Sequence, residues 1–410
     1  MLRRLLLRGG IWLTAGQGLS AAAAFLRNIV IARLVSVEDF GIVVLLSLTL
    51  SVLETVSNLA IDRLLVQASD GNDPKLQSVA HALQVIRGVM GGVILFLVAG
   101  WVATLFKIPH TTWAFQLLAL VPVIRSFLHL DTVRFQREMR YKPTFWFDAV
   151  PQLISLGLAI PLGYLLRDYS AVVWAMLAHA FAYTAISHFL ANRPYRWAWE
   201  RAIVIRVMSF GWPLLANGLL MFAIFQGDKA VIAVAFTPEI VGWYGAAFML
   251  SMAPAMLVTT VMQSLLLPVL SSSKDAPDEF RQRHEKTLQA CLTIGLLTAA
   301  VFAVYGPELL IALFGERYRD GASVVVLLGI TQGVRIAKSG QFVSAVAIAD
   351  TKIPLIANLA RGAALFVAIG FVALGYGPVV VAVTGLFGES IAYAIAMRLL
   401  SKHVRYPVVS

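Results

Sequence analysis

Eight basic side chains lie inside long apolar stretches of this sequence, where charge is uncommon. They are Arg27, Arg63, Arg87, Arg125, Lys229, Arg335, Lys338 and Arg361. The acids in or near the same stretches are fewer, namely Glu54, Asp62, Asp148, Asp228 and Glu389. Guanidinium and ammonium groups are natural partners of phosphate and diphosphate. The surplus of cations therefore predicts a cavity that binds an anionic ligand.

Arg335 and Lys338 are three residues apart, so they share one face of a helix. Together with Arg27 and Lys229 they lie deepest in their apolar stretches. We predict that these four cations line one central cavity. We expect further cations to contribute to it, namely Arg63, Arg125 and Arg361.

Glu54, Asp62 and Asp148 are candidate acids for coupling to an ion gradient. Two adjacent pairs leave another interpretation open, because Asp62 precedes Arg63 and Asp228 precedes Lys229. Such neighbours could be local charge-balanced features near helix ends, since ionisable groups in membranes also pair structurally.

The composition excludes an ordinary water-soluble protein. Of the 410 residues, 59% are hydrophobic and 13% are charged, and the mean hydropathy is +0.79. A soluble domain has about 45–50% apolar and about 25% charged residues. The net charge of +11 would suggest nucleic acid, but the basic residues fall mostly in short breaks between apolar runs. A membrane protein without a nucleic-acid partner is therefore predicted.

Twelve stretches are long and apolar enough to cross a membrane, since a crossing needs about 20 such residues. They are 10–32, 39–66, 77–104, 112–133, 143–166, 170–191, 203–229, 239–270, 286–306, 321–348, 353–374 and 378–400. Segments 39–66 and 112–133 carry internal charges. Gly9, Gly10, Gly16 and Gln17 interrupt the apolar run near the N-terminus, so a retained first helix is expected rather than a cleaved signal peptide.

The loops between these stretches alternate in charge. With the N-terminus inside, 20 Lys and Arg residues are cytoplasmic and 5 are on the other side. This bias predicts that both termini are cytoplasmic. The longest polar break, 271–286, is expected to form a short helix on the cytoplasmic surface.

An internal repeat relates the two halves at an offset of 201 residues. Glu38 and Gly41 correspond to Glu239 and Gly242 without a gap, and Arg27 corresponds closely to Lys229. Six predicted spans separate the copies, so both have the same orientation. We expect an all-α membrane protein of about twelve helices, with residues 1–200 and 201–410 as two six-helix bundles related by a parallel repeat. The break 191–202 is the predicted linker.

No catalytic or metal-binding pattern is recognised. Cys291 is the only cysteine, which excludes an intramolecular disulfide and a cysteine metal cluster. His81, His129, His179 and His188 have no metal-site spacing, and no phosphate-cradling glycine loop or Ser-His-Asp arrangement is present. The sequence therefore predicts no cofactor, no metal and no enzymatic activity.

Four segments resemble signatures of one transporter family. The first is Arg27-Asn-Ile-Val-Ile-Ala-Arg-Leu with Glu38-Asp-Phe-Gly, and the second is Asp228-Lys-Ala-Val-Ile with Val241-Gly-Trp-Tyr-Gly-Ala-Ala. The others are Ala191-Asn-Arg-Pro-Tyr-Arg-Trp and Leu313-Phe-Gly-Glu-Arg-Tyr. Together they resemble the Wzx-like oligosaccharide and polysaccharide flippases, over nearly the whole chain.

This resemblance implies the multidrug/oligosaccharidyl-lipid/polysaccharide exporter fold in a bacterial inner membrane. It also implies transport, by alternating access, of undecaprenyl-pyrophosphate-linked repeat units for O-antigen, capsule or exopolysaccharide assembly. The implied partners are the lipid-linked oligosaccharide, membrane lipids and other polysaccharide assembly proteins. Because the charges of the lumen vary within the family, no single residue transfers as a contact.

Alternatives remain. A multidrug or cation antiporter of the same fold should have an acidic lumen, whereas this one is basic. A peptidoglycan precursor flippase is expected to have two further helices. A membrane polymerase or ligase needs a large outer loop, whereas the longest here is about 306–320. A purely structural membrane subunit would not need eight cations in its spans.

Overall fold

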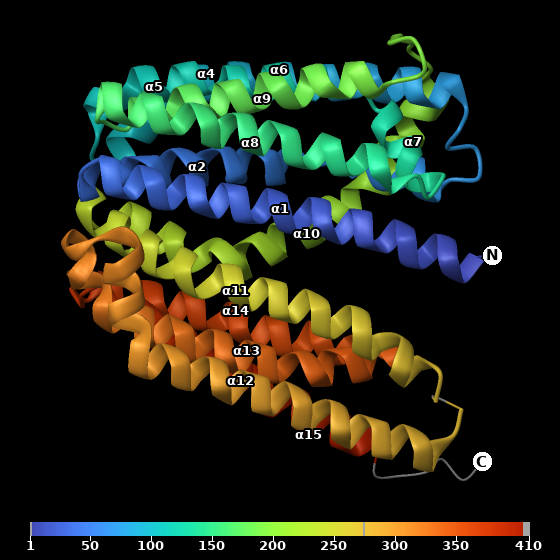
Figure 1. The fold of residues 1–410 in the computed structure, drawn as a ribbon, viewed down its shortest axis with the longest axis vertical. Coiled ribbons are helices and arrows are strands. Elements are labelled where there is room, and N and C mark those ends of the chain that lie inside the picture. Colours follow the sequence, from blue (N-terminus) through green and yellow to red (C-terminus); the bar gives the residue numbers. More distant parts are fainter. Residues whose placement is uncertain (1, 274, 405–410) are drawn as a thin grey trace. The chain divides into compact units, whose positions relative to one another are not determined.

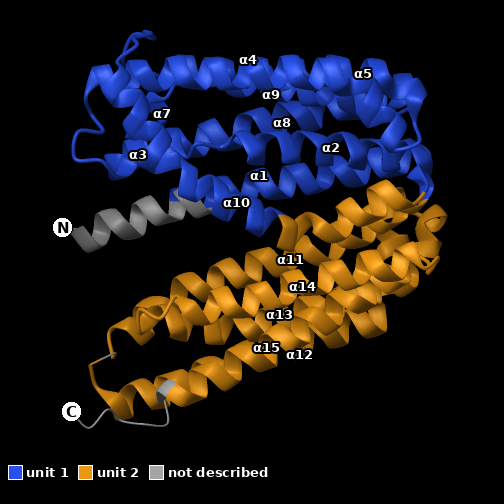
Figure 2. Cartoon of the chain, turned by 180° about the vertical axis from the view of Figure 1, so that it is seen from behind, with its two compact units in different colours: residues 1–222, 237–239 blue, residues 223–236, 240–410 orange. Residues whose placement is uncertain are grey.

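The chain divides into two compact units in a computed structural model that describes the backbone of residues 2–273 and 275–404. Unit 1 comprises Met1–Phe222 and Thr237–Glu239, and unit 2 comprises Ala223–Phe236 and Ile240–Ser410 (Figure 2). Each described unit consists of helices and loops without a strand. The sequence-based boundary between residues 200 and 201 stays a prediction.

Unit 1 is a bundle in which α1 packs along α8, α8 along α9, and α4 along α5 and α6 (Figure 1). Its helices are α1 Leu2–Leu34, α2 Val37–Ser57, α3 Ile61–Gln67, α4 Pro74–Leu105, α5 Thr112–Leu118, α6 Leu120–Ser126, α7 Asp131–Arg137, α8 Tyr141–Leu166, α9 Ser170–Leu190 and the first part of α10 Arg201–Ala235, with a 3₁₀ turn η1 at Pro109–Thr111.

Unit 2 is a bundle in which α13 packs along α12 and α15, and α15 along α14. Its helices are the second part of α10 Arg201–Ala235, α11 Pro238–Ser271, α12 Pro277–Phe314, α13 Ala322–Ala347, α14 Lys352–Ala373 and α15 Val379–Val404, with a 3₁₀ turn η2 at Glu316–Gly321.

The predicted membrane fold is confirmed. Among the described residues, 10 helices are long and apolar enough to cross a membrane, and the bent pair Pro109–Ser126 and Asp131–Arg137 counts as an eleventh. Helix α1 covers the predicted first span, although side chains before Trp12 lie outside the described residues. The protein is therefore an all-α membrane protein with about twelve crossings in two bundles.

Two predicted spans are interrupted. In 39–66, α2 ends at Ser57 and α3 begins at Ile61, because Ala60 has a left-handed backbone (φ 48°) and its N–H donates to the side-chain oxygen of Asn58 (2.8 Å). In 112–133, α6 ends at Ser126 and α7 continues after a 57° bend. Both segments carry the internal charges noted in the sequence.

The predicted separate surface helix at 271–286 is wrong. Helix α12 begins at Pro277 and runs without interruption to Phe314, because its polar first turns are stabilised as part of the long helix. Two acid–base pairs four residues apart, Glu279–Arg283 and Arg281–Glu285, join successive turns there.

The repeat is visible in the helix boundaries. Helix α1 ends at Leu34 and α10 at Ala235, while α2 begins at Val37 and α11 at Pro238. Each pair is separated by the same 201 residues as the sequence repeat. Gly41 and Gly242 occupy the fifth position of α2 and α11, and both are buried. The turn between the helices is therefore the unit that the repeat preserves.

Helices α12 and α13 approach each other at a pair of glycines. A Cβ on Gly333 would lie 2.5 Å from the carbonyl oxygen of Gly295, and a Cβ on Gly295 would lie 2.4 Å from that of Gly333. Small residues at this crossing let the backbones pack closely, which is a common way to join helices in membranes.

We therefore expect Gly333→Ala to destabilise the protein, since overpacking of this kind costs about 1–3 kcal/mol of stability. The measurement is the melting temperature of the purified protein in detergent, which should fall. Gly370→Ala is the matched control, because no atom lies within 4 Å of its added Cβ. Gly370 lies inside α14, where replacing glycine by alanine should leave the melting temperature unchanged or raise it slightly, because alanine favours the helix. Equal melting temperatures for the two variants would contradict the close packing of α12 and α13.

The segment after α9 is non-helical and is fixed to unit 1 by buried polar groups. The fully buried carboxylate of Asp131 accepts N–H bonds from Asn192 (2.7 Å) and Arg193 (3.2 Å). His129 Nε2 bonds to the carbonyl oxygen of Arg193 (3.0 Å), and His81 Nδ1 to that of Arg196 (3.2 Å). These histidines therefore bind backbone, and no metal-holding group is found among the described residues.

Asp131→Ala should release this segment, because two backbone donors lose a charged acceptor worth about 1.5–3 kcal/mol each. Trypsin should then cleave after Arg196 at least about tenfold faster than in the unsubstituted protein. The exposed Asp320 provides the control variant Asp320→Ala. Unchanged cleavage of Asp131→Ala would show that other contacts hold the segment.

Candidate functional site

A network of buried charges joins four helices of unit 2. Glu389 of α15 is 1% exposed and forms ion pairs with Lys338, with Arg335 Nη2 (3.4 Å) and with Arg361 Nε (3.5 Å). Arg361 Nη2 also binds Asp228 Oδ2 of α10 at 2.7 Å. We call these five residues the unit 2 charge cluster.

The cluster contains three cations and two carboxylates, so its formal charge is +1. Arg335 and Lys338 lie on one face of α13, as their spacing predicts, and their side chains keep 15% and 14% exposure. Arg361 of α14 is almost fully buried, at 2%. Arg361 therefore serves as an internal partner, whereas Arg335 and Lys338 remain partly accessible.

Two glycines of α15 make room for Arg361. A Cβ on Gly388 would lie 2.4 Å from the Cβ of Ala364 and 3.4 Å from Cδ of Arg361. A Cβ on Gly385 would lie 3.2 Å from Oδ2 of Asp228. Larger residues at either glycine would displace the helices that hold the cluster together.

Lys229 does not join this cluster, although it follows Asp228 in the sequence. Its Nζ lies over the ring of Phe248, 4.6 Å from the centroid. The described part of the chain gives Lys229 no ion pair or hydrogen bond, so this cation has only the aromatic face as a partner.

Arg27 is the corresponding cation of unit 1, and it too lacks an ion pair with any described residue. Its Nη1 donates to Ser155 Oγ (3.0 Å) on α8, and Nη2 contacts Asn28 Oδ1 at 3.5 Å. Its Nε has no hydrogen-bond acceptor in the described structure. This partly buried guanidinium is bound only by neutral oxygens, so no described acid compensates its positive charge.

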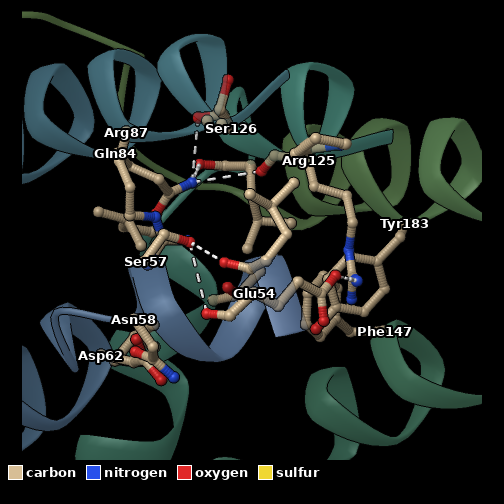
Figure 3. A pocket seen from close by; sticks show the side chains of 18 of the residues that line it. Glu54, Ser57, Asn58, Asp62, Gln84, Arg87, Arg125, Ser126, Phe147 and Tyr183 are labelled. Atoms are coloured by element: carbon tan, nitrogen blue, oxygen red, sulfur yellow. Dashed lines mark hydrogen bonds and ion pairs between the residues drawn. The ribbon is translucent and has the colours of Figure 1, made fainter. Parts of the chain in front are cut away.

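Unit 1 also contains a polar pocket of about 280 Å³, at the ends of α2 and α6 (Figure 3). Its charged lining residues are Glu54, Asp62, Arg87 and Arg125. Arg125 forms an ion pair with Glu54 and lies over the ring of Tyr183, 5.3 Å from its centroid. The side chains of the pair are 34% and 47% exposed, so both face open space.

The remaining predicted site residues lie apart from these groups. Arg63 is exposed on α3 and does not line the pocket, while Asp148 is partly buried on α8. Asp148 has no hydrogen bond or ion pair among the described residues. Its predicted coupling role stays a prediction.

Sequence reasoning thus found the cations but not their arrangement. The structure brings Arg335, Lys338 and Arg361 together and places Arg125 in a separate pocket in unit 1. The common cavity of Arg27, Lys229, Arg335 and Lys338 stays a prediction. The sequence analysis did not predict that Glu389 pairs with three cations. The available signal was a single acid directly after Gly388 in an apolar run, where an ionisable group needs a partner.

Glu389→Gln should destabilise the protein strongly, because three cations would then share a single carboxylate. Removing one partner of a buried ion pair costs about 3–5 kcal/mol. We expect a clear fall in melting temperature, partly reversed when Lys338→Met is added. Glu308→Gln at an exposed position of α12 is the control. A stable Glu389→Gln protein would show that the cluster does not hold the helices together.

Comparisons with known proteins indicate a common family. The profile of a family described as polysaccharide biosynthesis protein matches residues 30–323, more than half of the chain. An uncharacterized membrane protein in the cps region of Klebsiella pneumoniae is 18% identical over 315 residues, which cover 76% of this chain and 65% of that protein. The match thus spans slightly less than two thirds of that relative's length.

Another relative is the lipopolysaccharide biosynthesis protein WzxC of Escherichia coli K12, 18% identical over 329 residues, with 80% of this chain and 67% of WzxC covered. Among solved structures, the lipid II flippase MurJ in an inward closed conformation is similar over 97% of this chain and 88% of its own, with a TM-score of 0.75 and 13% identity. At that identity, the similarity shows the fold.

Proposed function

Because this chain belongs to the polysaccharide biosynthesis protein family, we propose that it moves lipid-linked oligosaccharide repeat units across the inner membrane. The repeat unit is carried on undecaprenyl diphosphate and passes from the cytoplasmic to the periplasmic leaflet. There it feeds assembly of O-antigen, capsule or exopolysaccharide. The chain is a multi-pass membrane protein and a transporter by family rather than an enzyme.

The surplus of cations in the apolar interior carries this proposal. The unit 2 charge cluster has formal charge +1, and Lys229 and Arg27 have no ion pair among the described residues. A cation in the hydrocarbon layer costs about 2.5–3.5 kcal/mol on the translocon scale. A diphosphate supplies the missing negative charge and gains strong charge-assisted hydrogen bonds in return.

The same charge balance argues against an antiporter for cationic drugs. Such a ligand would need acids to receive it, whereas Asp228 and Glu389 are already bound by Arg335, Lys338 and Arg361. The names of the relatives, one from a cps region and one of lipopolysaccharide biosynthesis, support the polysaccharide alternative.

Alternating access driven by an ion gradient is the mechanism we propose, with both termini in the cytoplasm. Asp148 is the better coupling acid, because it forms no ion pair with a described residue and, unlike Asp62, does not line the polar pocket of unit 1. Glu54 would first have to release Arg125 before it could bind a proton or cation. Other polysaccharide assembly proteins are proposed partners on the periplasmic side.

Lys229→Gln should slow transport at least about tenfold, because the amide removes a desolvated charge for the diphosphate without adding bulk. Lys229→Arg should retain most activity, since the charge remains. The assay uses proteoliposomes that contain galactose linked to undecaprenyl diphosphate. Transport is measured as the rate at which the galactose becomes accessible to added galactose oxidase.

Arg201→Gln, at the exposed start of α10, is the control for loss of one positive charge. Comparable melting temperatures of the variants show that folding is unaffected. A wild-type rate no higher than in empty liposomes would overturn the proposed function. A normal rate for Lys229→Gln would refute the role of this cation.

A further inference from the structure

The polar pocket of unit 1 is built where two membrane helices stop. Helix α2 ends at Ser57 and α6 at Ser126, and both residues line the pocket together with Asn58 and Leu128 from the breaks (Figure 3). Non-helical backbone is tolerated at membrane depth only where it is covered by protein or borders a hydrated cavity. Discontinuous helices of this kind form binding sites in many transporters.

The break after α6 is stabilised by side-chain contacts from α4. Gln84 of α4 donates from Nε2 to the carbonyl oxygens of Ser126 (3.1 Å) and Leu128 (3.2 Å), which α6 cannot satisfy after its end. A Cβ on Gly88, one turn along α4, would lie 2.2 Å from the Cβ of Ser126. The pocket is therefore preformed by close packing of α4 on α6.

The charges of this pocket cancel, in contrast to those of unit 2. Two acids, Glu54 and Asp62, face two bases, Arg87 and Arg125, and one acid–base pair is already formed between Glu54 and Arg125. A diphosphate would meet two carboxylates here and gain little attraction. The pocket therefore suits a neutral, polar ligand.

Three planar polar groups line the pocket without a hydrogen bond or ion pair to any described residue: the carboxylate of Asp62, the guanidinium of Arg87 and the amide of Gln136. The carboxylate offers two acceptors side by side, the guanidinium offers two donors, and the amide offers one of each, which matches neighbouring hydroxyl groups on a sugar ring. Tyr183 and Phe147 add apolar lining. The volume of about 280 Å³ is near the lower end of small-molecule sites, roughly 300–1,000 Å³.

We propose that this pocket binds a neutral sugar of the lipid-linked saccharide, through Asp62, Arg87 and Gln136. The inference rests on the proposed function and extends it, because it assigns sugar recognition to unit 1 and to groups other than the cations that take the diphosphate. It also means that selectivity among saccharides depends on hydrogen-bond complementarity in this pocket.

Equilibrium binding to the purified full-length protein in nanodiscs tests this assignment. The probes are bare undecaprenyl diphosphate and undecaprenyl diphosphate carrying galactose, glucose or N-acetylglucosamine. We expect at least one glycosylated probe to bind about fivefold or more tightly than the bare lipid, since a few net hydrogen bonds suffice for that difference. Asp62→Ala and Gln136→Ala should each remove most of this gain and leave the affinity for the bare lipid within about twofold.

Gln67→Ala is the matched control, because Gln67 is exposed at the end of α3 and does not line the pocket. Asp62→Asn should keep part of the gain, since an amide still bonds to hydroxyl groups. If Asp62→Ala does not fold, Gln136→Ala carries the test alone.

Three results would overturn the assignment. The first is equal binding of bare and glycosylated lipids by the wild-type protein, which leaves the proposed function intact. The second is a gain that survives both pocket variants. The third is loss of transport in Asp62→Ala and Asp62→Asn with all affinities unchanged, which would make Asp62 an ion-coupling acid. Failure of the wild-type protein to bind any of the lipids would instead refute the proposed function together with the sugar site.

Discussion

The cost of leaving a charge or a backbone polar group unpaired in hydrocarbon shapes both units of this protein. In unit 2, this cost is met by pairing: Glu389 receives three cations from two helices, and Asp228 holds Arg361 from the other side. Glycines at 385 and 388 give these long side chains the space they need. The packing of α10, α13, α14 and α15 and the pairing of the cluster therefore depend on the same side chains and the same two glycines.

In unit 1, the same cost is met by capping. The chain leaves the helical path after Ser57 and after Ser126, and the freed polar groups are taken by Asn58 and Gln84. The result is a polar pocket with balanced charges rather than a salt-bridged core. Two units with related helix boundaries thus stabilise their ionisable groups differently, which is consistent with the proposed substrate, whose diphosphate is anionic and whose sugars are neutral.

The repeat is preserved in the turns between helices rather than in the contacts of its charged residues. The boundaries of α1 and α2 recur 201 residues later in α10 and α11, and the buried Gly41 and Gly242 recur with them. The cations of the repeat, Arg27 and Lys229, differ in their partners, since one binds the Ser155 hydroxyl and the other an aromatic ring. Helix boundaries are thus shared between the copies, while the cations at near-equivalent positions have different partners.

The sequence by itself determined the class of this protein. Apolar runs of membrane-spanning length dictate helices, since lipid leaves the backbone no other way to bond, and the resemblance to polysaccharide flippases is confirmed by the family match. The shared helix face of Arg335 and Lys338 followed from their spacing. Only the tertiary structure decided that both meet Glu389, that Arg361 is an internal partner, and that segments 39–66 and 112–133 break around a pocket. The reason is physical: helical periodicity fixes which face a residue occupies, whereas its partners come from other helices, up to 133 residues away for Arg361 and Asp228.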